Sequence, residues 1–398
     1  MEKIDNLLIN IASKLINSST KNRLPTMDEN LGSILFLANY YNCTKDVNYK
    51  NKALEILNNS IDSFSNQNLK SGIYEGFDGF AYLAGQLDHI GILESENLLV
   101  DFIPHLEKSL KADLPLNNFD VLYGSMGKFQ FILHCTYISK SRKISLVDNF
   151  VNNLFSNRLV DEKGTYWYEN SKKCSINLGL AHGIPGILIF LSHLEFLGYK
   201  NPYIKIMIDG LQRKIMSLEN HVSGLSSFGT GYVGNTNAKS YSRLGWCYGD
   251  LGIIYALLYS ASISNSEYIL EKCAVYIEIV LSRDLCTSGV IHFHEQSCFD
   301  PGFCHGISGI VYILIRIKEL FPHEKITKRI QYWNNELIKN VEKVLDSPTM
   351  YYPDLSLSGE KLEIYDKSNF LNGLSGVGLT LLSSKYNIRN WSQFFLLY

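Results

Sequence analysis

The chain has 398 residues, of which 46% are hydrophobic and 19% are charged, enough for one large globular core or two modest ones. The formal net charge is −2 and no block of Lys and Arg stands out, which argues against a nucleic-acid-binding protein. Eight cysteines in a chain of this length are not expected to form a disulfide framework in a reducing compartment, so most should lie in the core.

The N-terminal sequence MEKIDNLLINIASKLINS has an amphipathic pattern that predicts a helix over residues 3–18. It lacks the apolar stretch and the small-residue cleavage site of a signal peptide. The longest apolar runs, such as ILIFL at 187–191, are much shorter than the ~18–20 residues that span a bilayer. We therefore expect a cytoplasmic protein.

One pattern, Gly-x-x-Gly, recurs along the chain and predicts a repeat architecture. A degenerate copy at 30–41 keeps Gly32 but has Leu35 in place of the second glycine. The other copies are EGFDGF (75–80), YGSMGK (123–128), HGIPGI (182–187), YGDLGI (248–253), HGISGI (305–310) and NGLSGV (372–377). Apolar segments such as GILIFLSHLEFL and GIVYILIRIKEL begin at the second glycine and predict buried helices. We expect the glycines to let the chain approach closely where helix starts crowd together.

A helical segment with one polar face lies between successive copies, for example at 49–64, 266–282 and 326–345. Each repeat thus pairs an outer amphipathic helix with a more apolar inner helix. The sequence predicts a single all-α domain over 1–398, an α/α toroid of seven inner and seven outer helices. An open helical solenoid is the alternative.

Four long connections precede the last four inner helices, and we expect them to form rim loops. They cover residues 156–181, 218–246, 283–303 and 346–371. Segment 156–181 contains the hairpin-like piece GTYWYEN and is the candidate for a small β-rich insertion.

Two neighbouring repeat starts carry potential metal ligands: Cys247 in one, Cys304 and His305 in the next. Two thiols and an imidazole suit a tetrahedral Zn²⁺ with one open position, which is the arrangement of catalytic sites. A thiol beside an apolar helix is also common as a core residue, so both readings stay open. Weaker alternative ligands are Cys298, His292 and His294.

Polar and charged side chains at other repeat starts are candidates for an active site. His182 occupies the position equivalent to His305, and Asp120 lies four residues before Gly124. Arg243 lies four residues before Cys247, and Tyr248 follows that cysteine directly. A charged group near a core is costly unless it is paired or used, so these residues are candidates for an active site.

The motifs AHGIPG (181–186), WCYGD (246–250) and CHGISG (304–309), in this order on seven repeats, resemble the lanthionine synthetase C-like family. The resemblance is to LanC, the cyclases of class I lanthipeptide (lantibiotic) biosynthesis, and it covers nearly the whole chain. It implies an α/α toroid with one Zn²⁺ held by Cys247, Cys304 and His305. It also implies His182, Asp120, Arg243 and Tyr248 as active-site residues.

The implied reaction is an intramolecular Michael addition. A cysteine thiol of a dehydrated precursor peptide, with leader and core, attacks dehydroalanine or dehydrobutyrine to give lanthionine or methyllanthionine. The resemblance further implies a dehydratase and an ABC exporter as partners, with peripheral attachment to the inner face of the membrane through that complex.

Three other functions remain as alternatives. Eukaryotic relatives of the family bind glutathione and add it to dehydroamino acids. A non-catalytic scaffold would hold zinc without an exchangeable ligand. An α/α-toroid glycosidase or terpene cyclase would need several carboxylates at the repeat starts, and only Asp120 is available there.

Overall fold

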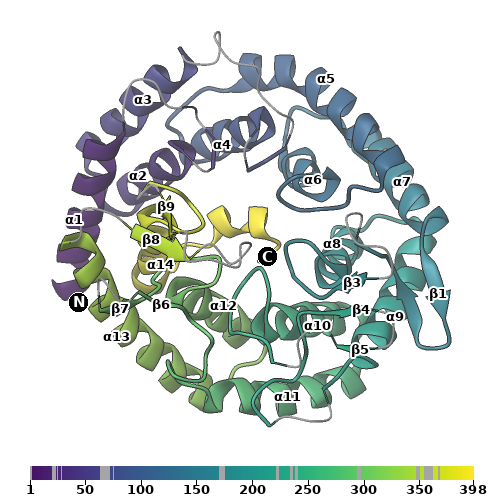
Figure 1. Ribbon diagram of the computed structural model, residues 1–398. Coiled ribbons are helices and arrows are strands. Elements are labelled where there is room, and N and C mark those ends of the chain that lie inside the picture. Colours follow the sequence, from purple (N-terminus) through teal and green to yellow (C-terminus); the bar gives the residue numbers. More distant parts are fainter. Residues whose placement is uncertain are drawn as a thin grey trace. The chain divides into compact units, whose positions relative to one another are not determined.

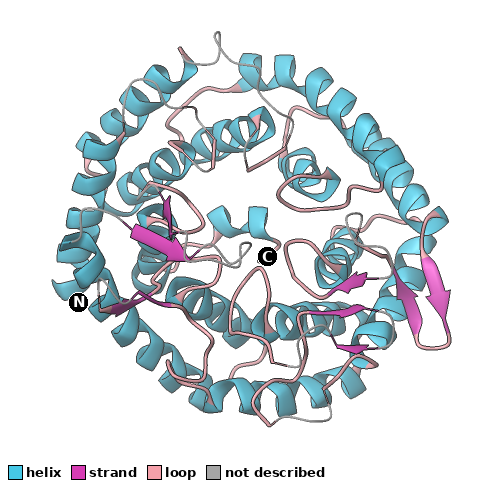
Figure 2. Ribbon diagram, viewed as in Figure 1, coloured by secondary structure: helices cyan, strands magenta, loops and turns pink. Residues whose placement is uncertain are grey.

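The computed structural model describes residues 2–19, 24, 26–27, 29–62, 72–74, 76–169, 175–220, 224–233, 236–237, 241–293, 297–346, 350–353, 362–365 and 368–398. Helices make up most of this part of the chain, and its strands are few and short (Figure 2). Within these ranges, no helix combines the length and the apolar character that crossing a membrane requires.

Fourteen α-helices follow one another in the described part of the chain. The odd-numbered ones are α1 (Glu2–Ser18), α3 (Val47–Ile61), α5 (Glu96–Asp113), α7 (Lys140–Ser156), α9 (Tyr203–Met216), α11 (Glu267–Ser282) and α13 (Glu324–Asp346). The even-numbered ones are α2 (Leu31–Thr44), α4 (Phe77–Ile90), α6 (Ser125–His134), α8 (Ile184–Phe196), α10 (Asp250–Ser264), α12 (Ile307–Leu320) and α14 (Leu374–Tyr386). This alternation confirms the predicted helix pairs.

The even-numbered helices from α4 onward begin directly after the first glycine of each copy, two residues earlier than predicted. At Gly183 a Cβ atom would clash with the carbonyl oxygen of Asn177, and at Gly249 with that of Arg243. Gly249 also has a φ of +146°, which favours glycine. At these two glycines the closest approach therefore lies within the repeat's own turn, six residues upstream. At Gly252 and Gly376 a Cβ would also press on Leu180 and Phe303 of neighbouring repeat starts, as the sequence predicted.

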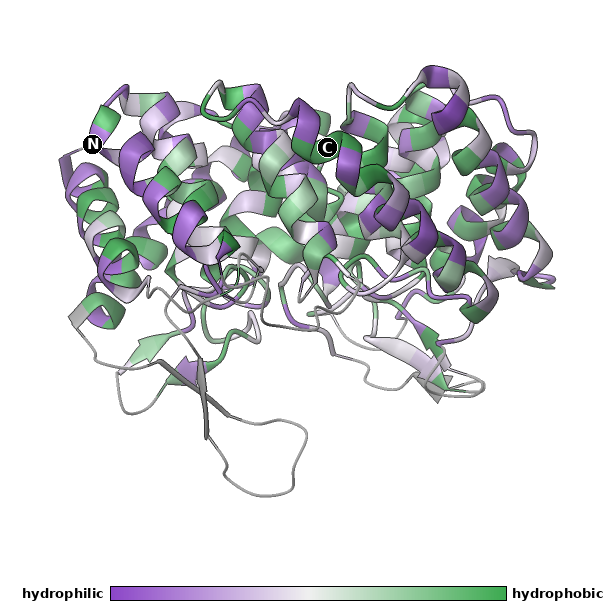
Figure 3. Ribbon diagram, turned by 90° about the horizontal axis from the view of Figure 1, so that it is seen from above, coloured by the Kyte–Doolittle hydropathy of each residue, from purple (hydrophilic) through white to green (hydrophobic). Residues whose placement is uncertain are grey.

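The odd-numbered helices are amphipathic because one face packs on the apolar helices and the other faces water. In α9, for example, Ile204, Met207, Leu211 and Ile215 are buried, following the helical period. By contrast, α10 is buried on all sides over most of its length. Figure 3 shows hydrophilic and hydrophobic segments alternating along the helix ribbons.

The chain forms two compact units, and the first comprises Met1–Leu99, Val290–Tyr312 and Ile330–Trp391. In this unit α2 packs on α1, α3 and α4, and α14 packs on α1 and α2. Segments from the two ends of the sequence are therefore neighbours, as Figure 1 shows for α1, α2 and α14. Gly32 makes this possible, because a Cβ at this position would press on Ser375 in α14.

The second unit comprises Val100–Gly289, Ile313–Arg329 and Ser392–Tyr398. Here α8 packs on α9 and α10, and α10 packs on α11. Figure 1 shows α9 to the right of α8 and α10, and α11 below α10.

All the strands that the structure describes lie in the four long connections predicted as rim loops. They are β1 (Leu159–Asp161), β2 (Gly164–Tyr166), β3 (Ser175–Asn177), β4 (Gly231–Val233), β5 (Thr236–Asn237), β6 (His292–Phe293), β7 (Cys298–Phe299), β8 (Met350–Pro353) and β9 (Leu362–Tyr365). Within segment 156–181, β1 and β2 form an antiparallel hairpin, whereas β3 pairs with β4 of the next connection. The strands of this segment therefore belong to two sheets.

A buried histidine fixes the C-terminal residues of the second unit. The His193 ring stacks on Tyr398 at 3.5 Å between centroids, and its Nδ1 lies 2.8 Å from the Tyr259 hydroxyl. The Tyr398 hydroxyl donates to Gln130 Oε1 (2.7 Å), and the Tyr255 hydroxyl donates to the Tyr398 carbonyl (2.8 Å). Burial lowers the pKa of His193 to about 3, so the folded protein holds it neutral.

We predict that His193 makes the protein sensitive to acid. Since its folded pKa is depressed, its contribution to stability is present above the ordinary value of 6.5 and is lost as the pH falls toward 3. Lowering the pH from 6.5 to 5 should cost about 2 kcal/mol through this residue. In urea unfolding, His193→Phe should lower stability at pH 7.5 but reduce the further loss at pH 5. The exposed His105→Phe control should lose as much as the unchanged protein, and an equal loss in all three would contradict the assignment.

Candidate functional site

The segment that carries Cys247 and Tyr248 is held in place on both sides. Ahead of the cysteine, the Leu244 N–H donates to the Ser288 carbonyl (2.7 Å). The fully buried Trp246 donates from Nε1 to the Phe395 carbonyl (3.0 Å). After the cysteine, Gly249 ends the tight turn and α10 begins. Cys247 itself is 5% exposed, so the backbone around it is fixed by buried contacts.

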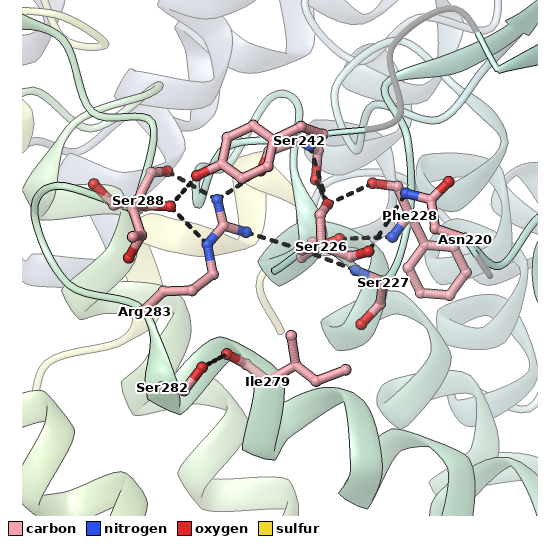
Figure 4. Close-up of polar contacts among 12 residues, drawn as sticks. Asn220, Ser226, Ser227, Phe228, Ser242, Ile279, Ser282, Arg283 and Ser288 are labelled. Atoms are coloured by element: carbon pink, nitrogen blue, oxygen red, sulfur yellow. Dashed lines mark hydrogen bonds and ion pairs between the residues drawn. The ribbon is translucent and has the colours of Figure 1, made fainter. Parts of the chain in front are cut away.

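A buried ion pair stabilises the segment that carries Cys247. Arg283 and Asp250 are both fully buried, and Arg283 Nη1 lies 3.0 Å from Asp250 Oδ2. Arg283 also donates to the Ser242 carbonyl (2.7 Å), while Asp250 accepts the Phe228 N–H (2.9 Å). Figure 4 shows the guanidinium of Arg283 beside Ser242 and Ser288. The pair thus ties the chain before Cys247 to the start of α10.

His182 and Asp120 form a hydrogen-bonded pair in the second unit. His182 Nδ1 contacts Asp120 Oδ2, and the other carboxylate oxygen accepts the backbone N–H groups of Leu122 (2.7 Å) and Tyr123 (2.9 Å). The His182 ring is nearly parallel to that of Tyr123, with centroids 6.4 Å apart. The backbone N–H groups of Leu122 and Tyr123 therefore hold the Asp120 carboxylate in place, and the carboxylate orients the His182 imidazole.

Tyr248 lies on another side of the same imidazole. Its ring centroid is 5.9 Å from that of His182, and its hydroxyl accepts a hydrogen bond from Asn177 Nδ2 (2.8 Å). Asn177 Oδ1 accepts the Gly179 N–H (2.7 Å), which fixes the amide orientation. Three consecutive repeats thus each supply one side chain to this cluster: Asp120, His182 and Tyr248.

The cluster lines a cavity of 440 Å³ within the second unit. Its lining includes Asp120, His182, Tyr248 and Asn177, together with the aromatic residues Phe119, Tyr123, Trp167 and Tyr168. Arg243 is absent from the lining. Its backbone carbonyl instead accepts the Asp250 N–H (3.3 Å), so the structure places Arg243 at the base of the Cys247 segment.

The electrostatics of the cavity favour a protonated His182. Burial opposes the charged form, but the hydrogen bond and charge of Asp120, with smaller effects of Cys247 and Glu169, raise the pKa of His182 above its ordinary value. Burial raises the pKa of Tyr248 to about 12, so its hydroxyl stays neutral. The cavity therefore places an imidazole whose protonated form is favoured beside a neutral phenol.

Cys304 and His305 lie in the first unit, directly before α12. The N–H groups of Phe303 and Cys304 both donate to the Leu371 carbonyl, at 2.7 and 2.9 Å. The fully buried Asp300 accepts the Gly302 N–H (2.7 Å), and its Oδ2 lies 3.7 Å from His305 Nδ1. A carboxylate on one ring nitrogen leaves the other for a metal ion, as is common for ligating histidines.

Cys247 in the second unit, and Cys304 and His305 in the first unit, are the potential metal ligands that the sequence predicted. Together they supply two thiols and an imidazole. Such a set of soft and borderline donors suits Zn²⁺. Cys298 is buried in β7 outside this group, and burial raises its pKa to about 11. His292 lies in β6, with its ring against Phe299, and His294 lies outside the described residues.

Several residues of the site were not predicted from the sequence, namely Asn177, Trp167, Asp250 and Arg283. Asn177 had a signal, because Asn118, Asn177 and Asp300 all lie six residues before the first glycine of a copy. Arg283 and Trp167 had none, since they come from connections without a repeated pattern.

The comparison with solved structures identifies the fold. The structure of nisin cyclase matches with a TM-score of 0.75 at 21% sequence identity, over 100% of this chain and 98% of that chain. The chain therefore has the α/α toroid fold, as the sequence predicted.

The family follows from the sequence itself. The model of the lanthionine synthetase C-like proteins matches residues 28–396, so the chain belongs to this family. The nisin biosynthesis protein NisC of Lactococcus lactis subsp. lactis is 26% identical over 396 residues, covering 92% of this chain and 87% of that protein.

We predict that the Asp250–Arg283 pair is essential for stability. Asp250→Asn leaves the Arg283 charge buried without its counterion and should lower the free energy of unfolding by about 3–5 kcal/mol. The matched control is Asp209→Asn, which breaks the solvent-exposed pair with Arg213 and should cost less than about 1 kcal/mol. Chemical denaturation measures both, and similar losses would contradict the role of the buried pair.

Proposed function

We propose that this protein is a zinc-dependent lanthipeptide cyclase. It adds cysteine thiols of a dehydrated precursor peptide to dehydroalanine or dehydrobutyrine and forms lanthionine or methyllanthionine rings. The observation that carries the proposal is the donor set of Cys247, Cys304 and His305, two thiols and an imidazole at the starts of two neighbouring repeats. Family membership and the likeness to NisC and nisin cyclase support it.

The three residues fit a catalytic rather than a structural zinc ion. They supply two thiolates and one imidazole, and the fourth tetrahedral position stays open for a substrate group. When bound, the ion would supply the positive charge that keeps a substrate thiol deprotonated near neutral pH. Asp300 would orient His305 through the ring nitrogen that faces away from the metal.

The acid–base work falls to His182. Attack of the thiolate sulfur on the β-carbon forms the C–S bond and moves the π electrons toward the α-carbon and its carbonyl oxygen. An imidazolium in the cavity would stabilise that negative charge and then give its Nε2 proton to the α-carbon. The proton that leaves the attacking thiol restores His182 through solvent, which balances the reaction.

Other residues of the cluster position this histidine. Asp120 holds the Nδ1 proton, and Tyr248, itself held by Asn177, limits the orientation of the ring. Arg243 does not line the cavity, and its backbone carbonyl, which accepts the Asp250 N–H, would position the turn that carries Cys247 rather than contact the enolate.

The wider context is also part of the proposal. The chain acts as one cyclase domain over 1–398 on a leader-bearing precursor peptide. A dehydratase supplies the dehydroamino acids and an ABC exporter removes the product, with the assembly in the cytoplasm at the inner face of the membrane.

We predict that Cys304→Ala loses zinc. Two remaining ligands cannot form a stable tetrahedral site, so metal analysis should find less than about 0.1 equivalent of zinc, against one for the unchanged protein. The buried cysteine of β7 provides the control, since Cys298→Ala should retain the metal. A Cys304→Ala protein with full zinc and full cyclisation would overturn the ligand assignment.

A second prediction separates acid–base chemistry from metal binding. His182→Asn should keep its zinc but close rings at least about 100-fold more slowly, because a general acid contributes about 10²–10⁴-fold. Mass spectrometry with thiol alkylation measures ring closure on a dehydrated precursor peptide. Ring closure at the rate of the unchanged protein would exclude His182 as the acid, and addition of glutathione without ring closure would favour the glutathione-transferring alternative.

A further inference from the structure

One wall of the 440 Å³ cavity is formed by Trp167, Tyr168 and Glu169, a segment that we call the Trp167 wall. It follows β2, and the Glu169 N–H is held by the Ser175 carbonyl (2.8 Å). The wall lines the same space as His182, and its only effect on the acid–base cluster described above is the contribution of Glu169 to the raised pKa of His182.

Trp167 carries a polar atom that the fold leaves unused. The residue is only 6% exposed, and its indole Nε1 is buried with no hydrogen-bond partner among the described residues. The indole ring makes a T-shaped contact with the ring of Phe119, with 6.4 Å between the ring centroids. A buried donor without a partner destabilises the folded protein, so an acceptor that enters the cavity and takes this hydrogen bond would bind more tightly.

The charge of the lining defines what kind of acceptor enters. Its ionisable acidic and basic residues are Asp120, Glu169 and His182, and no Lys or Arg contributes to it. Asp120 and His182 form a hydrogen-bonded pair, and the half-buried Glu169 adds a carboxylate whose negative charge helps to raise the pKa of His182. The cavity therefore attracts a cationic rather than an anionic group.

Aromatic side chains supply the remaining surface. Tyr168 and Tyr123 are 41% and 43% exposed and both line the cavity, so they offer flat apolar faces to a bound segment. An extended peptide matches these features, since it presents backbone carbonyls, apolar surface and side-chain charge together.

We propose that the Trp167 wall is a subsite for the peptide segment that carries the dehydroamino acid. Trp167 Nε1 donates to a backbone carbonyl of the substrate, and Glu169 selects segments with a Lys or Arg side chain beside the reacting residue. This inference rests on the proposed function, because it takes the ligand to be the peptide that His182 protonates.

The test uses binding of peptides that cannot react. Three synthetic hexapeptides share one dehydroalanine, contain no cysteine, and differ only in a flanking Lys, Gln or Glu. Isothermal titration calorimetry with the full chain at low salt should give a Kd for the Lys peptide about 5-fold lower than for the Gln peptide. The Glu peptide should bind more weakly than either, and added salt should narrow these differences.

Two variants test whether the Trp167 wall causes the Lys preference and contributes to peptide affinity. Glu169→Gln should bring the Lys and Gln peptides to equal affinity, while the control Glu162→Gln, exposed between β1 and β2, should keep the 5-fold preference. Trp167→Phe should weaken all three peptides by about the same 5-fold factor without changing their order, since it removes the N–H donor and keeps an apolar aromatic ring. Its thermal unfolding is recorded to show that the variant folds.

Equal affinity of the unchanged protein for the three peptides, or an undiminished preference in Glu169→Gln, would overturn the charge selection. Unchanged binding by folded Trp167→Phe would overturn the hydrogen bond. The readout does not involve ring closure, so failure of the proposed cyclase activity is a separate result. A Lys preference without cyclisation of any dehydrated peptide would keep the subsite and reject the enzyme.

Discussion

A tight turn of the backbone is the constraint on which this structure depends. In each complete repeat the chain folds back on itself before the inner helix, and a carbonyl group six residues upstream occupies the space that a glycine side chain would need. Gly183 and Gly249 show this most clearly, with the carbonyls of Asn177 and Arg243. The residue just before the glycine is then fixed at the helix start. His182, Tyr248 and His305 all occupy this position.

The same turn explains why the chemistry can vary while the fold is kept. The glycines carry the geometry, so the preceding position is free to be an acid–base group, an aromatic neighbour or a metal ligand. Additional stability comes from elsewhere, since the buried Asp250–Arg283 pair and the Trp246 indole hold the Cys247 segment without entering the cavity. The local turns thus position the candidate active-site side chains, whereas contacts between distant parts of the sequence stabilise the segments that carry them.

The difference between local turns and long-range contacts also explains which features of the structure could be predicted from the sequence. The helix pairs and the residues before the glycines follow a repeated pattern, so their number, order and grouping could be read in advance. The helix starts were predicted two residues late, because the first glycine acts as the N-cap. Trp167, Glu169 and Arg283 could not be predicted, because they lie in connections with no repeat, and only long-range pairing such as β3 with β4 brings those connections into place.

The central claim is that two cysteines and one histidine hold a zinc ion with one exchangeable position. Cobalt substitution tests this most directly, since thiolate-to-cobalt absorption reports the number of sulfur ligands. We expect a tetrahedral spectrum with two thiolates that gains a third when a cysteine-containing peptide is added. A spectrum that already reports a closed site, and that no thiol peptide changes, would contradict it.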